Sequence, residues 1–584
     1  MHSRDWNLTI ARVVYGLSNY VRESVLDVDE EGYLVIKLSN GQIRVKDLMD
    51  RNNLDIAYIR VLPAIKKSMD MVYESYKAIA EALGYEKSLV PVYPMKVNPT
   101  PIVVETIAKY GEKYKWGFNA GSVGEVKLLQ KIAEEYSPRT LIYDGVITES
   151  IAQELLKFSS RGWRVIVDVD SEAETEVVAK YPGLEVGLRI KPLVKLHGKW
   201  SGSVGLASKF GLTLNTLSKL KEEFKWLVDR VVMLHMHPGS QVYRLEDVEK
   251  YFNEVKHVYE ELGYMGFENI TLVDPGGGMA YPYLDSRDGS EEAPDYTIVD
   301  YFRALLDKFA RVSKRPDLVF EGGRFITAAH RVVVAKVVEV KPYSAVHSQR
   351  EQQEELKDVK NIEEIKELLS RLRVMLENLR TNGPLTNSKR ALYEDLVATI
   401  REDLPAKVAE LLVEGKVDVS ELLSEQRILR ILLTPTKRVV LNMSIFADLP
   451  DAVLVDQYFQ AVPVHRLCEQ PSVLATFSDL TCDSMGELNL FISQGAKVKG
   501  GSPIFTKFDN RLIMLPGVKL RLRGVPLHLP ERGENYYVAF LDTGAYQDTL
   551  AMKHNLIYGA PEIIVDEENG KVKVEFLRHE EYYS

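Results

Sequence analysis

One lysine in this chain stands where a lysine can do chemistry. Residues 91–99 read Pro-Val-Tyr-Pro-Met-Lys-Val-Asn-Pro, and Lys96 follows an apolar run that is typical of a short buried strand. The Asn-Pro pair after it favours a break in the chain toward a helix. A crowded lysine at the end of a core strand has a lowered pKa and becomes a nucleophilic amine able to form a Schiff base. The alternative for this segment alone is a lysine whose ammonium simply reaches solvent.

Other reactive side chains follow other apolar runs. Asp274-Pro-Gly-Gly-Gly278 comes directly after one of them, and three glycines let backbone N–H groups approach an anion such as phosphate. The next run ends in Glu321-Gly-Gly-Arg324, which supplies a carboxylate and a guanidinium. The preceding run ends in His235-Met-His237, whose alternation puts both imidazoles on one side. Each motif alone has an ordinary alternative, a tight turn for the glycines and a satisfied core position for each histidine.

Taken together, these groups match the needs of pyridoxal phosphate. The lysine would hold the aldehyde, while glycine amides, a serine and an arginine would hold the phosphate. A carboxylate beside the pyridine nitrogen would keep it protonated, so that the ring acts as an electron sink, and His237 could stack on the ring. The rival is a divalent metal, because the two histidines with Asp274 and Glu321 could bind one. A metal explains neither Lys96 nor the glycine triplet.

Composition limits the class of protein. The chain has 584 residues, which predicts several domains, and its net charge of −10 disfavours a nucleic-acid partner. No run approaches the ~18 apolar residues of a membrane span, and the first residues resemble no signal peptide. The two cysteines, Cys468 and Cys482, exclude a disulfide framework and fit a reducing cytoplasm. We therefore expect a cytoplasmic protein acting on a small molecule, without nucleic-acid or membrane partners.

Residues 51–345 alternate short apolar runs with helical patterns. The runs are 88–93, 115–118, 140–143, 163–168, 184–190, 230–237, 270–274 and 318–321. Eight strands alternating with helices over about 250 residues predict a parallel (β/α)8 (TIM) barrel, with a doubly wound sheet as the alternative. A barrel would gather the groups named above, because reactive residues of such enzymes lie past the carboxyl ends of the strands.

The remaining segments differ in pattern. In residues 1–50, Asn40-Gly41 joins two alternating runs and predicts a β hairpin. Residues 346–430 have amphipathic helical spacing and predict an inserted helical bundle with a structural or oligomeric role. Residues 431–584 return to short alternating strands and predict a C-terminal antiparallel β-sandwich or barrel domain, completed by the N-terminal hairpin.

A series of motifs in fixed order resembles one known family. In the barrel the motifs span residues 93–98, 118–125, 197–200, 208–212, 235–241, 274–278 and 321–328. In the β domain they span residues 449–452, 455–459, 463–467, 481–484, 544–547 and 554–556. Their order and spacing resemble the biosynthetic arginine decarboxylase family, within the fold-type III, alanine-racemase-like group of pyridoxal-phosphate decarboxylases. The resemblance covers about residues 55–560, and the helical insert separates this family from ornithine and diaminopimelate decarboxylases.

The resemblance implies a role for each matching residue. Lys96 would hold the cofactor, His237 would stack on it, and Glu321 would pair with the pyridine nitrogen. Further cofactor contacts would come from Arg189 near the ring oxygen and, around the phosphate, from Ser240, Gly276, Gly277, Gly278, Arg324 and Tyr546. Cys482 would arrive from a second subunit and protonate the substrate's α-carbon. Asp456 and Asp483 would face the substrate's cationic end. The implied assembly is a homodimer or homotetramer with shared active sites, although Cys482 by itself also fits a small buried apolar residue.

The implied reaction is decarboxylation of L-arginine to agmatine and carbon dioxide, a step toward polyamines, with Mg²⁺ as a second cofactor to test. Three departures from the family pattern leave the substrate open. Met485 stands where an acidic residue is usual, Asn119 replaces an acid of the second strand, and Met279 begins a segment where a Gly and an Asp are common. The alternatives are the same chemistry on lysine, ornithine or a carboxylated polyamine, and a cofactor-binding protein without turnover.

Overall fold

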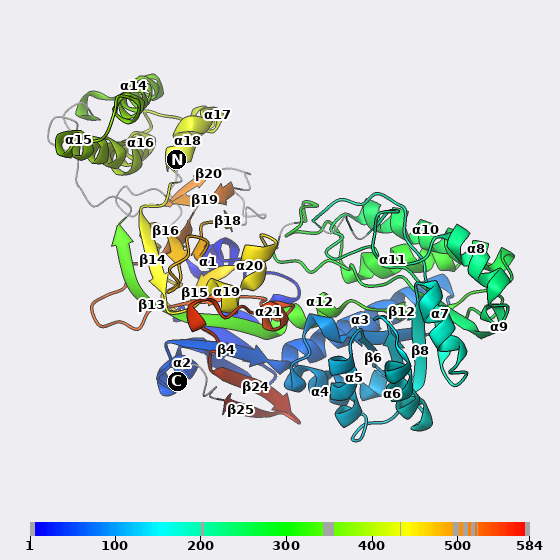
Figure 1. The fold of residues 1–584 in the computed structure, drawn as a ribbon. Coiled ribbons are helices and arrows are strands. Elements are labelled where there is room, and N and C mark those ends of the chain that lie inside the picture. Colours follow the sequence, from blue (N-terminus) through cyan, green and yellow to red (C-terminus); the bar gives the residue numbers. More distant parts are fainter. Residues whose placement is uncertain are drawn as a thin grey trace.

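A closed barrel of eight parallel strands positions the reactive groups (Figure 1). The computed structural model describes residues 6–199, 202, 204–285, 287–342, 356–432, 434–493, 502–505, 512–515, 520–522 and 524–577. The barrel strands are β5 (Leu89–Pro94), β6 (Gly117–Ala120), β7 (Thr140–Tyr143), β8 (Arg164–Val169), β9 (Glu185–Arg189), β10 (Val231–His235), β11 (Leu272–Asp274) and β12 (Asp317–Phe320). These are the eight predicted runs, and closure between β12 and β5 confirms the barrel over the doubly wound sheet.

Strand register aligns the carboxyl ends of neighbouring strands. His235 pairs with Arg189 on one side and with Asp274 on the other. The strands are buried on both faces, as parallel strands covered by helices must be. The covering helices are α3 (Leu62–Leu83), α4 (Pro101–Tyr110), α5 (Val123–Ile132), α6 (Glu149–Ser160), α7 (Glu172–Ala179), α8 (Leu214–Glu223), α9 (Leu227–Arg230), α10 (Leu245–Tyr264) and α11 (Ile298–Phe309).

A ten-stranded sheet lies beside the barrel in Figure 1. Its strands are β4 (Ile56–Val61), β13 (Arg331–Pro342), β14 (Lys437–Leu441), β15 (Ala461–Pro463), β16 (Val473–Ser478), β17 (Glu487–Leu488), β22 (Val525–Leu527), β23 (Tyr537–Phe540), β24 (Glu562–Glu568) and β25 (Lys571–Leu577). Two of its pairings, β14 with β16 and β24 with β4, are parallel, so the sheet is mixed rather than purely antiparallel.

The sheet also takes strands from the range predicted for the barrel. β4 precedes the barrel and β13 follows it, and the two pair antiparallel from Arg331–Arg60 to Ala335–Ile56. This pairing joins residues some 270 positions apart, which local sequence patterns do not reveal. The first and last strands of the predicted 51–345 unit, β4 and β13, therefore belong to the ten-stranded sheet and connect the barrel to it.

The predicted N-terminal hairpin is present. β2 (Leu34–Leu38) and β3 (Gly41–Arg44) pair antiparallel around Asn40-Gly41, and β1 (Leu26–Val28) adds a third strand. This small sheet is separate from the ten-stranded one, but the Leu34 N–H donates to the Val464 carbonyl across the gap at 2.9 Å. Helices α1 (Leu8–Val14) and α2 (Val45–Arg51) flank it.

The predicted helical insert connects β13 to β14. It consists of α14 (Ile362–Thr381), α15 (Asn387–Ala398), α16 (Leu404–Val413), α17 (Val419–Ser424) and α18 (Gln426–Leu432). Figure 1 shows it at the upper left, away from the barrel. Two short strand pairs, β18 (Phe491–Ser493) with β21 (Leu520–Leu522) and β19 (Ser502–Phe505) with β20 (Leu512–Leu515), complete the β structure. Among the described residues, every helix is too short or too polar to cross a membrane.

Candidate active site

A cavity of about 490 Å³ opens where the barrel strands end. One wall comes from the loops after β5, β10, β11 and β12, and the other from the short helices α20 (Pro450–Leu454) and α21 (Gln547–Leu550) of the sheet domain. The predicted residues that line it are Lys96, His237, Ser240, Gly277, Gly278, Glu321, Arg324 and Tyr546. Groups from positions 96 to 546 of the chain therefore meet in one space.

The turn that carries Lys96 is held by the sheet domain. Lys96 lies in a single 3-10 turn, Met95–Val97, directly after β5. The Val97 carbonyl accepts a hydrogen bond from the Tyr546 N–H at 2.8 Å. The Asn98 side chain donates to the Gly544 carbonyl at 2.9 Å and to Asp548 at 2.7 Å. Because Asp548 is in turn paired with Arg60 at 3.0 Å, the lysine turn and the Tyr546 loop are fixed to each other through buried groups.

The charge state of Lys96 differs from the sequence expectation. Its side chain reaches into the cavity and stays 46% exposed, with Nζ 3.8 Å from Asp144 Oδ2. Burial alone lowers the pKa of Lys96, but Asp144, Glu321 and Tyr546 together raise the pKa above its ordinary value. The prediction of a lowered pKa is therefore wrong for the chain by itself, because it considered crowding and not the neighbouring carboxylates.

Gly277 and Gly278 of the glycine triplet line the same cavity as Arg324. Gly276 (φ +72°) and Gly278 (φ +88°) adopt backbone conformations that favour glycine, and a Cβ on Gly276 would lie 2.6 Å from the Met236 carbonyl oxygen. Across the cavity, Arg324 Nη2 donates to Ser240 Oγ at 3.2 Å, and its guanidinium lies 4.7 Å from the centre of the Tyr546 ring. The arrangement offers an anion a fixed cation, a hydroxyl and open backbone.

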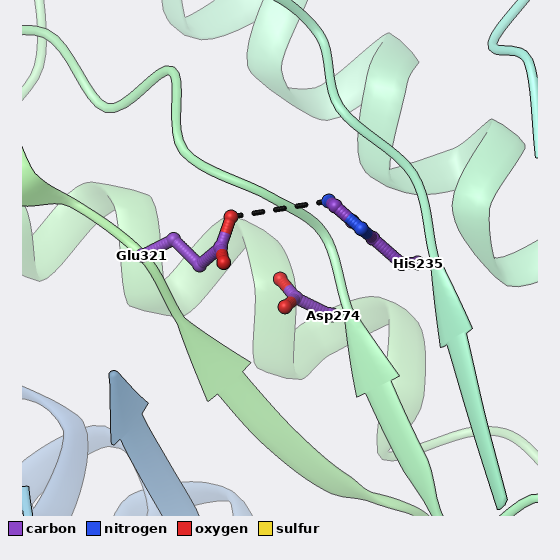
Figure 2. A group of neighbouring side chains, drawn as sticks. All are labelled: His235, Asp274 and Glu321. Atoms are coloured by element: carbon purple, nitrogen blue, oxygen red, sulfur yellow. Dashed lines mark ion pairs between the residues drawn. The ribbon is translucent and has the colours of Figure 1, made fainter. Parts of the chain in front are cut away.

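Glu321 is buried among polar partners. It is 2% exposed and accepts a hydrogen bond from Asn119 Nδ2 at 2.7 Å. Burial holds the pKa of Glu321 above its ordinary value, although His235 and Lys96 act to lower it. Figure 2 shows the ion pair that runs from Glu321 to His235 Nε2, 3.8 Å away, with Asp274 beside both. Glu321 is thus a carboxyl group whose proton can be controlled by what binds next to it.

The two histidines have opposite charge preferences. His235 Nδ1 lies 2.5 Å from Asp168 Oδ2; burial lowers the pKa of His235, but Asp168 and Asp274 raise it to about 9. Burial and the nearby Lys96 hold the pKa of His237 well below its usual range, and its Nδ1 accepts from the Gly239 N–H at 3.0 Å. These shifts favour the imidazolium form of the buried His235 and the neutral form of His237, which lines the cavity.

The same cluster offers a donor set for a metal. Ligand atoms of His235, Asp274 and Glu321 lie within 4.8 Å of one another. A metal requires a neutral imidazole, while the pKa of about 9 favours the protonated form of His235 near neutral pH. A metal bound to this donor set would therefore have to displace the proton that Asp168 and Asp274 favour on His235.

The predicted residues Cys482, Asp483, Asp456 and Arg189 do not line this cavity in the single chain. Cys482 is exposed, with Sγ 3.6 Å from Asn555 Oδ1, and Asp483 Oδ2 lies 3.7 Å from His554 Nε2. Asp456 lines a separate cavity of about 720 Å³, where its carbonyl accepts from Lys199 at 2.9 Å. Arg189 is buried behind Lys96, with Nη1 3.6 Å from Asp144 Oδ2.

Sequence reasoning missed Asp144 and Asp168, the acids that set the charges of Lys96 and His235. Asp144 directly follows β7, so the rule that reactive groups follow barrel strands could have found it. Asp168 lies inside β8, where an acid in an apolar run is a weak signal because pleat and pairing decide which way it points. Tyr283, which accepts from Arg324 at 2.9 Å, carried no signal at all.

Comparisons with known proteins agree with the fold. Residues 69–328 match the family model of the pyridoxal-binding domain of pyridoxal-dependent decarboxylases. A biosynthetic arginine decarboxylase from Bacteroides thetaiotaomicron is 27% identical over 95% of this chain and 87% of its own. The crystal structure of the biosynthetic arginine decarboxylase from Campylobacter jejuni superposes with a TM-score of 0.69 at 23% identity, over 97% of this chain and 90% of that one. A diaminopimelate decarboxylase from M. jannaschii, crystallised with L-lysine, gives a TM-score of 0.60 at 17% identity, over 95% and 96% of the two chains.

Proposed function

We propose that this chain, whose barrel is the pyridoxal-binding domain of the pyridoxal-dependent decarboxylase family, decarboxylates L-arginine to agmatine and carbon dioxide. The observation that carries the proposal is the single cavity shared by Lys96, the glycine triplet, Glu321 and Arg324. An amine, an anion cradle and a buried carboxyl group in one space suit one aldehyde cofactor with a phosphate, pyridoxal 5′-phosphate. Relatives named as biosynthetic arginine decarboxylases over nearly the whole chain support the substrate.

The residues present fit this cofactor. Arg324, Ser240 and the amides near Gly277 and Gly278 would hold the phosphate, because the guanidinium and hydroxyl already face the open glycine backbone. The flat, neutral ring of His237 would lie against the pyridine. When bound, the cofactor supplies an electron sink for the pair left at the substrate's α-carbon when carbon dioxide departs.

The chain's own groups then control protons and position. Glu321 would pair with the ring nitrogen, and Asn119 Nδ2, donating at 2.7 Å, fixes the direction of its carboxyl group. His235, held by Asp168, places a positive charge 3.8 Å from Glu321 and favours its anionic form, so that the proton stays on the cofactor nitrogen. Lys96 supplies the amine that holds the cofactor, and the sheet domain fixes its turn.

The substrate half of the site completes the proposal. Cys482, exposed in one chain, would reach the cavity of a partner chain and return a proton to the α-carbon, with Asp483 and Asp456 near the substrate's cationic group. This makes the protein a homodimer or homotetramer with shared sites, acting in the cytoplasm on the route to polyamines. Mg²⁺ dependence, tested by chelation with EDTA, belongs to the same proposal.

Binding and substrate choice are tested in two steps. Protein incubated with pyridoxal phosphate is expected to show a visible absorbance band that Lys96→Ala abolishes, while Lys67→Ala, which changes a half-buried lysine outside the cavity, retains it. Carbon dioxide release is then measured over arginine, lysine, ornithine and a carboxylated polyamine. Release of carbon dioxide from arginine alone supports the proposal. Release from one of the other amino acids would make that compound the substrate and would agree with the departure at Met485. A coloured protein that releases nothing would be a cofactor-binding protein without turnover, and a colourless one would overturn the proposal.

A further inference from the structure

Asp144 lies between two cations at the edge of the cavity. Its Oδ2 is 3.8 Å from Lys96 Nζ and 3.6 Å from Arg189 Nη1, and its side chain is only 7% exposed. The guanidinium carbon of Arg189 also lies 4.6 Å from the centre of the Phe210 ring. One carboxylate thus separates two cations that would otherwise repel each other in a confined space.

The backbone fixes Asp144 at this place. The Asp144 N–H donates to the Ala120 carbonyl at 3.1 Å, which extends the pairing of β6 with β7 by one residue. The next residue, Gly145, packs so closely on Gly121 that a Cβ there would lie 2.1 Å from the Gly121 carbonyl oxygen. The backbone that carries the Asp144 carboxylate is therefore held on both sides by contacts with the neighbouring segment, residues 120–121.

The neighbouring strand β6 explains why the acid directly follows β7. Asn119 on β6 donates to Glu321 at 2.7 Å, and its side chain also helps to lower the pKa of Asp144. An acid at position 119 would set a carboxylate against Glu321, and two such groups do not ionise together. Because position 119 is an amide, the negative charge beside Lys96 comes instead from Asp144, directly after β7.

We infer that Asp144 is the counter-ion of Lys96 and a positioning residue of the active site, which holds the amine and Arg189 in fixed relation. The role of Asp144 in catalysis rests on the proposed function, whereas its ion pairs with Lys96 and Arg189 are present in the chain without cofactor. The charged and titratable groups that face Lys96 are Asp144, Glu321, Tyr546, Arg189, His237 and Glu125. Of these, Asp144 is the acid that also pairs with Arg189, so its removal changes both partners.

The test measures the reactivity of Lys96 in the full chain without cofactor. Trace acetylation across a pH series, with the Lys96 peptide quantified by mass spectrometry, gives the midpoint at which its amine loses the proton. Asp144→Asn is expected to lower that midpoint by about one pH unit, so that labelling at pH 8 becomes about tenfold faster. Asp144→Glu, which keeps the charge, is expected to stay within about threefold of wild type.

Glu125→Gln is the matched control, because it removes another acid that faces Lys96 without touching Arg189. An unchanged midpoint in Asp144→Asn, or an equal shift in Glu125→Gln, would overturn the inference. If Asp144→Asn does not fold, Arg189→Gln replaces it: loss of the competing cation should slow Lys96 labelling about threefold, and no slowing would count against the counter-ion role.

A second readout uses the protein loaded with pyridoxal phosphate. The pH at which its visible band changes should move in Asp144→Asn and stay in Asp144→Glu, which a merely structural role would not produce. The labelling experiment contains no cofactor, so it tests the pairing of Asp144 with Lys96 independently of the proposed function. Failure to bind pyridoxal phosphate would count against the proposed function alone.

Discussion

The two halves of the proposed site, one for the cofactor and one for the substrate, are built in different ways. The cofactor half is made of side chains from barrel strand ends and the Tyr546 loop, gathered around one cavity within a single chain. The substrate half, represented by Cys482 and Asp483, lies on an exposed surface of the sheet domain. If Cys482 acts in the site of a partner chain, as proposed, then one chain can bind the cofactor and turnover requires two.

Burial separates the halves as well. Glu321 and His235 are nearly inaccessible and linked by charged partners, whereas Met485 near Cys482 is 56% exposed. Polar groups in a low-dielectric interior must be fully paired, so the cofactor half tolerates little change. Met485 in the exposed half has no such constraint, whereas the other two departures, Asn119 and Met279, are buried in the cofactor half and must be matched by their neighbours.

The strongest test of the cofactor half is Glu321→Gln. The amide keeps the shape and can still accept the hydrogen bond from Asn119, but it loses the charge that faces the proposed ring nitrogen. We expect carbon dioxide release to fall by about 10²–10³-fold, or about 2.7–4 kcal/mol, with the visible band retained. A steady-state assay with an absorbance spectrum checks this, and a rate near wild type would mean that Glu321 is only structural.

The barrel and most of the cofactor half could be predicted because their signals are local. Each barrel strand is a short apolar run between turns, and Lys96, the glycine triplet, Glu321 and Arg324 directly follow such runs. The pairing of β4 with β13 could not be predicted, because it depends on contacts between distant segments. The raised pKa of Lys96 was missed for the same reason, since its cause is Asp144 on another strand.

Mixed variants test whether the two halves come from different chains. Cys482→Ala is expected to lower the rate about 10²-fold, because a positioned acid contributes about that much. If sites are shared, mixing Lys96→Ala with Cys482→Ala should restore about a quarter of wild-type activity, through mixed dimers with one intact site. Mixing Lys96→Ala with Glu321→Gln is the control and should restore nothing, because both changes damage the same half. Equal results from the two mixtures would refute shared sites.

The smallest expected effect is on stability and concerns the seam, the buried contacts of Arg60, Asn98 and His330 that join the cofactor half to the sheet. His330 is buried there, with Nε2 3.4 Å from Arg60 Nη1 and Nδ1 2.5 Å from the Thr327 carbonyl oxygen. Burial, together with Arg60, lowers the pKa of His330 to about 3, so the folded chain keeps it neutral. The unfolded chain binds a proton below about pH 6.5, and stability falls as the pH drops from there toward 3, by at most about 1.4 kcal/mol per pH unit.

His330→Gln removes this titration and should flatten the dependence. Between pH 6.5 and 5, wild type is expected to lose about 1.5 kcal/mol more than the variant, measured from urea unfolding midpoints at each pH. His257→Gln is the control, because it changes a histidine on α10 and should leave the slope of wild type intact. Parallel curves for wild type and His330→Gln would show that His330 can be protonated in the folded chain. The seam would then admit a proton or water more readily than the contacts of Arg60 and Asn98 indicate. The contrast between a rigid cofactor half and an exposed substrate half would be weaker.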